Sequence, residues 1–89
     1  MSYEYPIDSD WSTEEIIQVI KFFETIEKAY ESKIEVRHVL EAYKKFKEVV
    51  PSKAEEKTLF KQFEKQSSYI PYKVVKEAKQ LNENDFISL

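Results

Sequence analysis

Apolar side chains recur along the chain at the spacing of one helical face. The first stretch with this pattern contains Ile16, Val19, Ile20, Phe23, Ile26 and Tyr30. A period of about 3.6 residues predicts a helix over residues 13–31. Ser12 and Glu15 have the spacing of a capping box, which would start this helix. Phe22 and Ala29 widen the apolar face, so we expect this helix to be the central one.

A second helix is predicted over residues 35–50. Its apolar stripe consists of Val36, Val39, Leu40, Tyr43, Phe46 and Val50. Ser32 and Glu35 also have capping-box spacing, and that pairing would start the helix earlier. Pro51 sets the end, because proline disfavours helical geometry in the residue before it.

Two shorter helices follow. Ser52 and Glu55 have cap spacing and predict a third helix over residues 53–66. Its buried face is made of Leu59, Phe60 and Phe63. Pro71 suits the first turn of a fourth helix over residues 71–81. That helix carries Val74, Val75, Ala78 and Leu81.

The remaining sequence shows no convincing strand pattern. Residues 1–11 precede the first helix as an aromatic arm, and residues 82–89 have no sustained period and are expected to form a loose tail. The fold prediction is therefore a single all-α domain over residues 1–89, a small array of about four helices with an extended aromatic N-terminal arm.

The chain contains no glycine and no cysteine, and both absences exclude classes of function. Phosphate-binding and dinucleotide-binding loops use backbone conformations that only glycine adopts cheaply. Disulfides, thiol nucleophiles and zinc–thiolate sites need cysteine. We expect turns to be made by serine and proline caps, so that no left-handed glycine cap is needed.

No targeting or membrane segment is visible in the sequence. The first residues lack the basic and apolar regions of a secretory signal. The longest apolar runs are pairs such as Phe22-Phe23, whereas a membrane span needs about 20 residues. We therefore expect a cytoplasmic protein.

Three parts of the chain resemble a known family. They are Tyr5-Pro6-Ile7-Asp8 with the following Trp11-to-Ile16 stretch, the block from Tyr43 to Lys57, and Tyr69 with the block from Tyr72 to Lys76. These residues are similar to the YktA-like proteins of Bacillus relatives, one of the UPF series of uncharacterised families. The one departure is Ile70-Pro71, where small polar residues are expected. The resemblance implies a compact all-helical cytoplasmic domain with no assigned activity, and it supplies no catalytic or binding residues.

Candidate catalytic and metal-binding residues are few. His38 is the only histidine, and with Glu35 it has the i, i+3 spacing of carboxylate-bridged di-iron bundles. Those sites need the motif twice, so a solvent-facing histidine is the favoured interpretation. Ser12 and Ser52 are better explained as helix caps than as nucleophiles, because no positioned base accompanies them. We expect no enzymatic activity, no catalytic residues, no metal and no cofactor.

Three glutamates of the first helix, Glu24, Glu27 and Glu31, lie close enough to suggest a paired-carboxylate site. Glu24 also has Lys28 at i+4, the spacing of a helical ion pair. The favoured interpretation is ordinary surface pairing.

Charge is distributed unevenly along the chain. Residues 1–31 carry eight acidic and two basic side chains, whereas residues 32–79 carry seven acidic and twelve basic ones. The tentative interaction surface consists of Lys53, Lys57, Lys61, Lys65, Lys73 and Lys76. These lysines are expected opposite the apolar faces of the third and fourth helices. They suit phosphates or an acidic partner, or they form a solvated face that keeps a small domain soluble.

Five aromatic residues lie outside the helical stripes: Tyr3, Tyr5, Trp11, Tyr69 and Tyr72. Packing of the arm and loop is favoured over exposure, because a small domain needs every apolar side chain that it can order. Exposed tyrosine and tryptophan would instead serve as anchors of an interface.

The favoured function is a small non-enzymatic protein that binds another protein. The alternative is an RNA or DNA accessory protein that uses the lysine-rich faces. It is disfavoured by a sequence pI near 5.2 and by the lack of arginine among these lysines. A homodimer between the acidic first helix and the basic third helix is also open.

Overall fold

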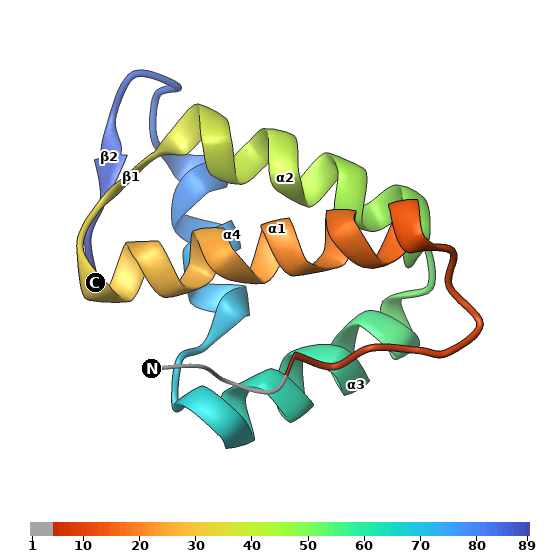
Figure 1. Ribbon diagram of the computed structural model, residues 1–89. Helices are drawn as coiled ribbons and strands as arrows, with labels where there is room; N and C mark the ends of the chain where they lie inside the picture. Colours follow the sequence, from red (N-terminus) through yellow and green to blue (C-terminus); the bar gives the residue numbers. More distant parts are fainter. Residues whose placement is uncertain (1–4) are drawn as a thin grey trace.

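Four α-helices make up most of the computed structural model, which describes residues 5–89 (Figure 1). They are α1 (Thr13–Glu31), α2 (Val36–Val49), α3 (Lys53–Ser67) and α4 (Pro71–Gln80). The all-α prediction is confirmed, and each helix end lies within one residue of its expected position. Tyr3 and the start of the predicted aromatic arm lie outside the described residues.

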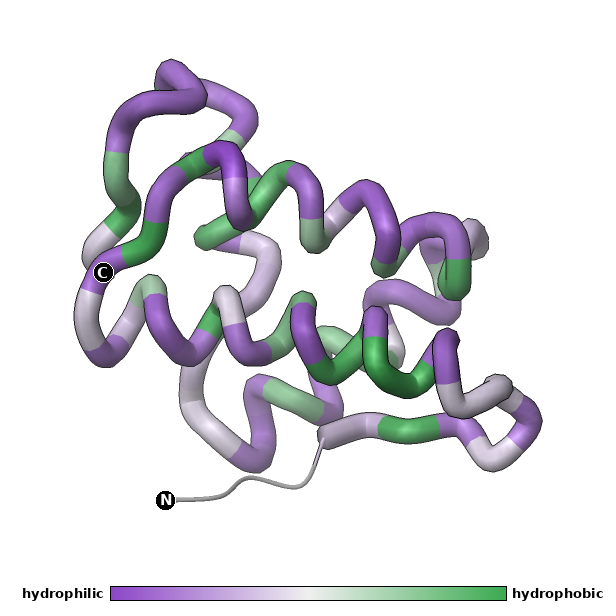
Figure 2. The backbone as a smooth tube through the Cα atoms, turned by 45° about the horizontal axis from the view of Figure 1, so that its top comes forward, coloured by the Kyte–Doolittle hydropathy of each residue, from purple (hydrophilic) through white to green (hydrophobic). Residues whose placement is uncertain are grey.

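Helices α1 and α2 run antiparallel and side by side, and α4 crosses behind them (Figure 1). Helix α3 lies below this pair in the same view, and the chain ahead of α1 runs along it. Hydrophilic and hydrophobic positions alternate along the helices (Figure 2). Within residues 5–89, none of the helices is long and apolar enough to cross a membrane.

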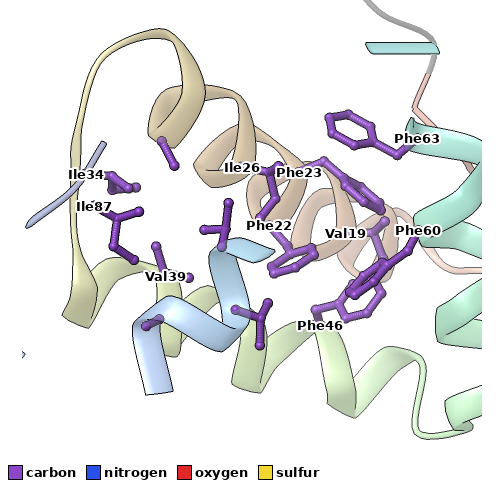
Figure 3. Packing of buried hydrophobic residues seen from close by; sticks show 14 of the residues in the cluster. Val19, Phe22, Phe23, Ile26, Ile34, Val39, Phe46, Phe60, Phe63 and Ile87 are labelled. Carbon is purple, nitrogen blue, oxygen red and sulfur yellow. The ribbon is translucent and has the colours of Figure 1, made fainter. Parts of the chain in front are cut away.

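Phenylalanine rings fill the space between the helices (Figure 3). Phe22 of α1 lies 4.6 Å from Phe46 of α2, measured between ring centroids. The next residue, Phe23, lies 4.5 Å from Phe63 of α3. All four rings are fully buried. Helix α1 therefore needs a wide apolar face, because adjacent residues pack against different neighbours.

The serine caps form as the sequence predicts. The Glu15 backbone N–H donates to Ser12 Oγ at 3.2 Å, and the Ser12 backbone N–H donates to Glu15 Oε1 at 2.8 Å. Ser52 Oγ accepts from the Glu55 N–H at 3.3 Å. Pro71 occupies the first turn of α4, as expected.

The prediction of a loose tail over residues 82–89 is wrong. Strand β2 (Phe86–Ile87) pairs antiparallel with β1 (Ile34–Glu35), a small sheet that the sequence pattern did not predict. Ile87 is only 2% exposed, and the Leu89 N–H donates to the Ala29 carbonyl at 2.7 Å. The C-terminal segment is thus an ordered part of the fold.

The start of α2 explains why the tail is ordered. The N-cap residue, Glu35, makes no side-chain capping bond, so the alternative Ser32–Glu35 capping box does not form. Instead, the Val36 N–H donates to the Asp85 carbonyl at 2.9 Å, and the Arg37 N–H donates to the Glu83 carbonyl at 3.3 Å. Backbone from the tail satisfies helix-end amides that a side chain would otherwise cap.

Helix α3 ends in a left-handed cap, although the chain has no glycine to make one. Ser68 has a φ of 68° and is the one residue with positive φ within residues 5–89. Its N–H donates to the Glu64 carbonyl at 2.7 Å. The left-handed conformation costs a non-glycine residue about 1–2 kcal/mol. Only residues 68–70 connect α3 to α4, and this short link requires the sharp change of direction.

Candidate interaction surface

A groove of about 530 Å³ lies between α3 and the start of α4. Helix α3 lines it with Lys53, Glu56, Lys57, Phe60, Lys61 and Glu64. The other wall consists of Ile70, Pro71 and Tyr72. We term this hollow the α3–α4 groove. Basic side chains from one helix here face apolar side chains from the next.

The structure brings together only half of the predicted lysine surface. All six lysines of that surface are exposed. Three of them, Lys53, Lys57 and Lys61, line the α3–α4 groove, whereas Lys65, Lys73 and Lys76 do not. The α3 lysines were expected on the opposite side of the helix from Leu59, Phe60 and Phe63, and for Phe60 this expectation is wrong. Phe60 lines the same groove, because that ring lies at the border of the buried face and is 8% exposed.

The three groove lysines have no acidic partner among residues 5–89. The ion pairs among residues 5–89 are Arg37–Glu35, at 3.4 Å, and Lys47–Glu56, at 2.6 Å. The ammonium groups of Lys53, Lys57 and Lys61 therefore have no carboxylate within 4 Å in this part of the chain. Their positive charge is available at the groove.

Glu56 also lines the groove, but its charge is already compensated. Its Oε1 accepts from Lys47 Nζ at 2.6 Å and its Oε2 accepts from the Tyr43 hydroxyl at 2.9 Å. Burial, and then the hydrogen bond to this carboxylate, raise the pKa of Tyr43 to about 12. This contact was not predicted from the sequence. A signal was present, since Glu56 falls on the same helical stripe as Leu59, Phe63 and Ser67, all of them buried.

Tyr72 is the exception among the off-stripe aromatic residues. Tyr5, Trp11 and Tyr69 pack against the core, as expected. The same expectation for Tyr72 is wrong, because its side chain is 63% exposed. It is the second residue of α4, and the buried face of that helix begins with Pro71 and continues with Val74.

The acidic cluster of α1 binds tyrosines of the same chain. Tyr5 donates from its hydroxyl to Glu27 Oε1 at 2.7 Å, and Tyr69 donates to Glu31 Oε2 at 2.8 Å. Burial raises the pKa of Glu27, although the bond from Tyr5 partly opposes this. The expected Glu24–Lys28 ion pair is absent from the pairs within residues 5–89. These carboxylates anchor the arm and the α3–α4 loop.

His38 is exposed, as predicted. With Lys45, it lines a second hollow of about 350 Å³ between α1 and α2, where acidic and basic side chains alternate. Across residues 5–89, no group of three histidine, cysteine, aspartate or glutamate side chains is placed to hold a metal ion. This hollow has less apolar lining than the α3–α4 groove, and both contain three lysines and two glutamates.

Comparison with known proteins identifies the family. The profile of the uncharacterised protein family UPF0223 matches residues 2–87. A UPF0223 protein of Bacillus pumilus is 54% identical over 89 residues, which span 100% of both chains. One from Oceanobacillus iheyensis is 54% identical over 85 residues, covering 96% of this chain and 97% of that protein. One from Streptococcus uberis is 46% identical over 85 residues, 96% of this chain and 92% of its own. The resemblance to a UPF family of Bacillus relatives is thus confirmed, and the chain belongs to UPF0223.

Proposed function

We propose that this protein binds a segment of another protein in the α3–α4 groove and catalyses no reaction itself. The exposure of Tyr72 carries the proposal. Its ring is 63% exposed at a groove that also contains Phe60, Ile70 and Pro71. Tyrosine is enriched at protein interfaces because it offers a large apolar ring together with a polar group.

The hydrogen bonds of the tyrosine hydroxyl groups also support a role for Tyr72 in binding a partner. Tyr5, Tyr43 and Tyr69 each donate to a glutamate, and Tyr30 accepts from the Ile70 N–H at 3.2 Å. Among the tyrosines within residues 5–89, only Tyr72 makes no hydrogen bond inside the chain. Four tyrosines thus serve the fold, and the fifth is available to a partner.

A binding role suits the remaining chemistry better than an enzymatic one. Ser12 and Ser52 use their side-chain oxygens to cap helices. The single histidine lines a different hollow from Lys53, Lys57 and Lys61. Nothing in the α3–α4 groove pairs a nucleophile with a base. The chain also has no cysteine, which suits the reducing cytoplasm as the place of binding.

The alternative function, association with RNA or DNA, rests on the same three lysines. Phosphate binding would use their charge but leave the apolar floor and Tyr72 without a role, unless the ring stacks on bases. Glu64, on the same wall, opposes phosphate. A protein interface would use both the apolar side chains and the lysines of the groove and is therefore preferred.

Site-specific photo-crosslinking in living cells of the native host tests the proposal. A photoreactive phenylalanine derivative at position 72 keeps an aromatic ring there, and the same residue at Ile17 is the control. Ile17 is 40% exposed, and it lies on α1 and outside the groove. We expect a discrete protein adduct from position 72 that position 17 does not give. The pair Lys57→Glu and Lys61→Glu should remove this adduct.

Two results would overturn the proposal. One is an adduct at position 72 that consists of nucleic acid and whose yield, when the crosslinking is repeated in cell lysate, falls with rising salt, as phosphate binding requires. The other is a set of protein adducts that is the same at both positions, or that survives the two lysine substitutions. The double substitution Lys21→Glu and Lys45→Glu controls for overall charge, because both lysines are exposed and lie outside the groove.

A further inference from the structure

We infer that the occupant of the α3–α4 groove is an acidic amphipathic helix of the partner protein. This inference rests on the proposed function and specifies the class of segment that the groove accepts. It depends on three properties of the groove: the sign and spacing of its charges, the helical nature of both walls, and the place of its apolar side chains.

The charge on the α3 wall is positive and regularly spaced. Lys53, Lys57 and Lys61 follow one another at intervals of four residues, which is about 6 Å along a helix axis. A helix with acidic residues at i, i+4 and i+8 repeats its charges at the same interval. In the part of the chain that the structure describes, none of these lysines pairs with a carboxylate, so pairing with the partner breaks no ion pair there.

The opposite wall adds positive potential. Helix α4 begins in the groove at Pro71, and its first turn contains no acidic residue. The amino-terminal end of a helix carries a partial positive charge from its unpaired amides. Lys73 does not line the groove, but it is exposed on the same turn, one residue after Tyr72. Both walls therefore favour a negatively charged occupant, and Glu64 is the single acidic group of the groove without a basic partner.

Both walls are helical, and this favours a helical occupant over an extended one. An extended segment gains its main-chain hydrogen bonds by adding to the edge of a sheet. The only sheet within residues 5–89 is β1–β2, and neither strand lines the groove. A helix satisfies its own backbone groups and offers only side chains to the groove.

The apolar side chains lie where the inner face of such a helix would pack. Phe60 is 8% exposed and Pro71 is buried, so both form a floor, whereas Tyr72 stands exposed at the side. Apolar residues at i, i+3 and i+4 of the occupant would contact the floor and the Tyr72 ring. Its acidic residues would then lie on the flank that faces the α3 lysines.

A second copy of this chain is a poorer occupant. Helix α1 is its most acidic helix, but Lys21 and Lys28 are exposed on either side of Glu24. Docking α1 against α3 would place those lysines near Lys53, Lys57 and Lys61. We therefore assign the acidic helix to a different protein.

Selection from a phage library of random peptides tests the inference with the full chain as bait. Peptides of about 16 residues allow about four helical turns. We expect the enriched sequences to carry acidic residues three or four apart beside leucine or aromatic residues at i, i+3 and i+4. Binding of a synthetic representative, followed by fluorescence anisotropy, should weaken at least about tenfold with Tyr72→Ala or with Lys57→Glu plus Lys61→Glu. Lys21→Glu plus Lys45→Glu should change it less than about twofold.

The outcomes separate this inference from the proposed function. Enriched peptides that are basic, uncharged or rich in proline, and that lose binding with Tyr72→Ala, overturn the acidic helix but leave the groove as a protein-binding site. An acidic peptide that binds equally well with a central proline also overturns the helix. Enrichment of a sequence matching residues 13–31 replaces the partner by a second copy. Peptides that all ignore the groove substitutions overturn both the inference and the proposed function.

Discussion

Two tyrosine–glutamate contacts lie next to the buried face of helix α3, and they differ in one charged group. The arm interface consists of Tyr5, Phe23, Glu27 and Phe63. There the Tyr5 ring lies 6.4 Å from Phe23 and 6.2 Å from Phe63 between centroids, and its hydroxyl binds Glu27. The α2 interface consists of Tyr43, Lys47 and Glu56, where the carboxylate also binds an ammonium group at 2.6 Å.

The difference shows what a carboxylate needs in order to be buried. Glu56 is only 8% exposed and has both a hydroxyl donor and a cation. Glu27 is half-buried and has the hydroxyl of Tyr5, but burial still raises its pKa. A single neutral donor therefore does not offset the loss of water around the charge, whereas a donor together with a cation permits deeper burial. The α2 interface should depend on its charges, and the arm interface on its rings.

Removing the central ring of the arm interface should have the largest effect. Phe63 is fully buried and stacks on both Phe23 and Tyr5. Phe63→Ala leaves a cavity between α1, α3 and the arm, and we expect a loss of about 3–5 kcal/mol in the free energy of unfolding. Urea unfolding followed by Trp11 fluorescence measures it. As a control, Phe86→Ala should cost less than about 1 kcal/mol, because Phe86 is 53% exposed. Equal effects of the two substitutions would contradict the role of Phe63.

The cation of the α2 interface gives the second prediction. Lys47→Met leaves the Glu56 carboxylate in place without its ammonium partner. We expect a cost of about 2 kcal/mol, below the range for a fully buried pair because the Lys47 side chain is 25% exposed. The double variant Lys47→Met plus Glu56→Gln should recover most of this loss, since no unpaired charge remains. A double variant no more stable than Lys47→Met would show that the lysine stem, and not its charge, holds the interface.

Removing one hydroxyl tests the arm interface on a smaller scale. Tyr5→Phe keeps the stacked ring and deletes the bond to Glu27, so we expect a loss of about 1 kcal/mol. The pKa of Glu27 should rise further, because the bond from Tyr5 lowers it. NMR titration of the Glu27 carboxyl carbon measures this shift. Tyr72→Phe is the matched control and should change neither quantity, and an unchanged Glu27 pKa in Tyr5→Phe would argue that the bond is absent in solution.

The sequence pattern predicted those elements that are determined by residues close together in the sequence. The helices follow from apolar spacing, and the caps at Ser12, Ser52 and Pro71 from residues a few positions apart. The ordered tail could not be predicted in this way, because Ile34 pairs with Ile87 across most of the chain. The strands hold two residues each, too few for a recognisable alternation.

The candidate site likewise has features that depend on one helix alone and features that depend on contacts between helices. The i, i+4 spacing of Lys53, Lys57 and Lys61 was visible, because one helix carries all three. The opposing wall with Tyr72 depends on how α4 leaves α3, and the left-handed Ser68 that sets this direction has no sequence signal in a chain without glycine. Glu56 is an intermediate case. Its position on the buried stripe was predictable, but its cation, Lys47, comes from another helix.

Replacing Glu27 with glutamine should give the smallest effect and the sharpest contrast between the two interfaces. Because the folded protein raises the pKa of Glu27, the folded state holds this proton more tightly than the unfolded state. Ionisation of Glu27 thus lowers stability as pH rises from the usual glutamate pKa through the raised value, and the loss remains at neutral pH. Glu27→Gln cannot ionise, so it should be slightly more stable than the wild type at neutral pH. This advantage should shrink as the pH falls through the same window.

Glu56→Gln should instead be less stable than the wild type at neutral pH, because it deprives Lys47 of its counter-charge. Thermal unfolding of both variants at a series of pH values between neutral and mildly acidic measures the comparison. If Glu27→Gln is instead less stable at neutral pH and its deficit shrinks on acidification, the Glu27 carboxylate stabilises the fold in its charged form. In that case the Tyr5 hydroxyl alone would stabilise the ionised Glu27 carboxylate, as Tyr43 and Lys47 together stabilise that of Glu56. The cation would then not be the difference that decides how the two interfaces depend on charge.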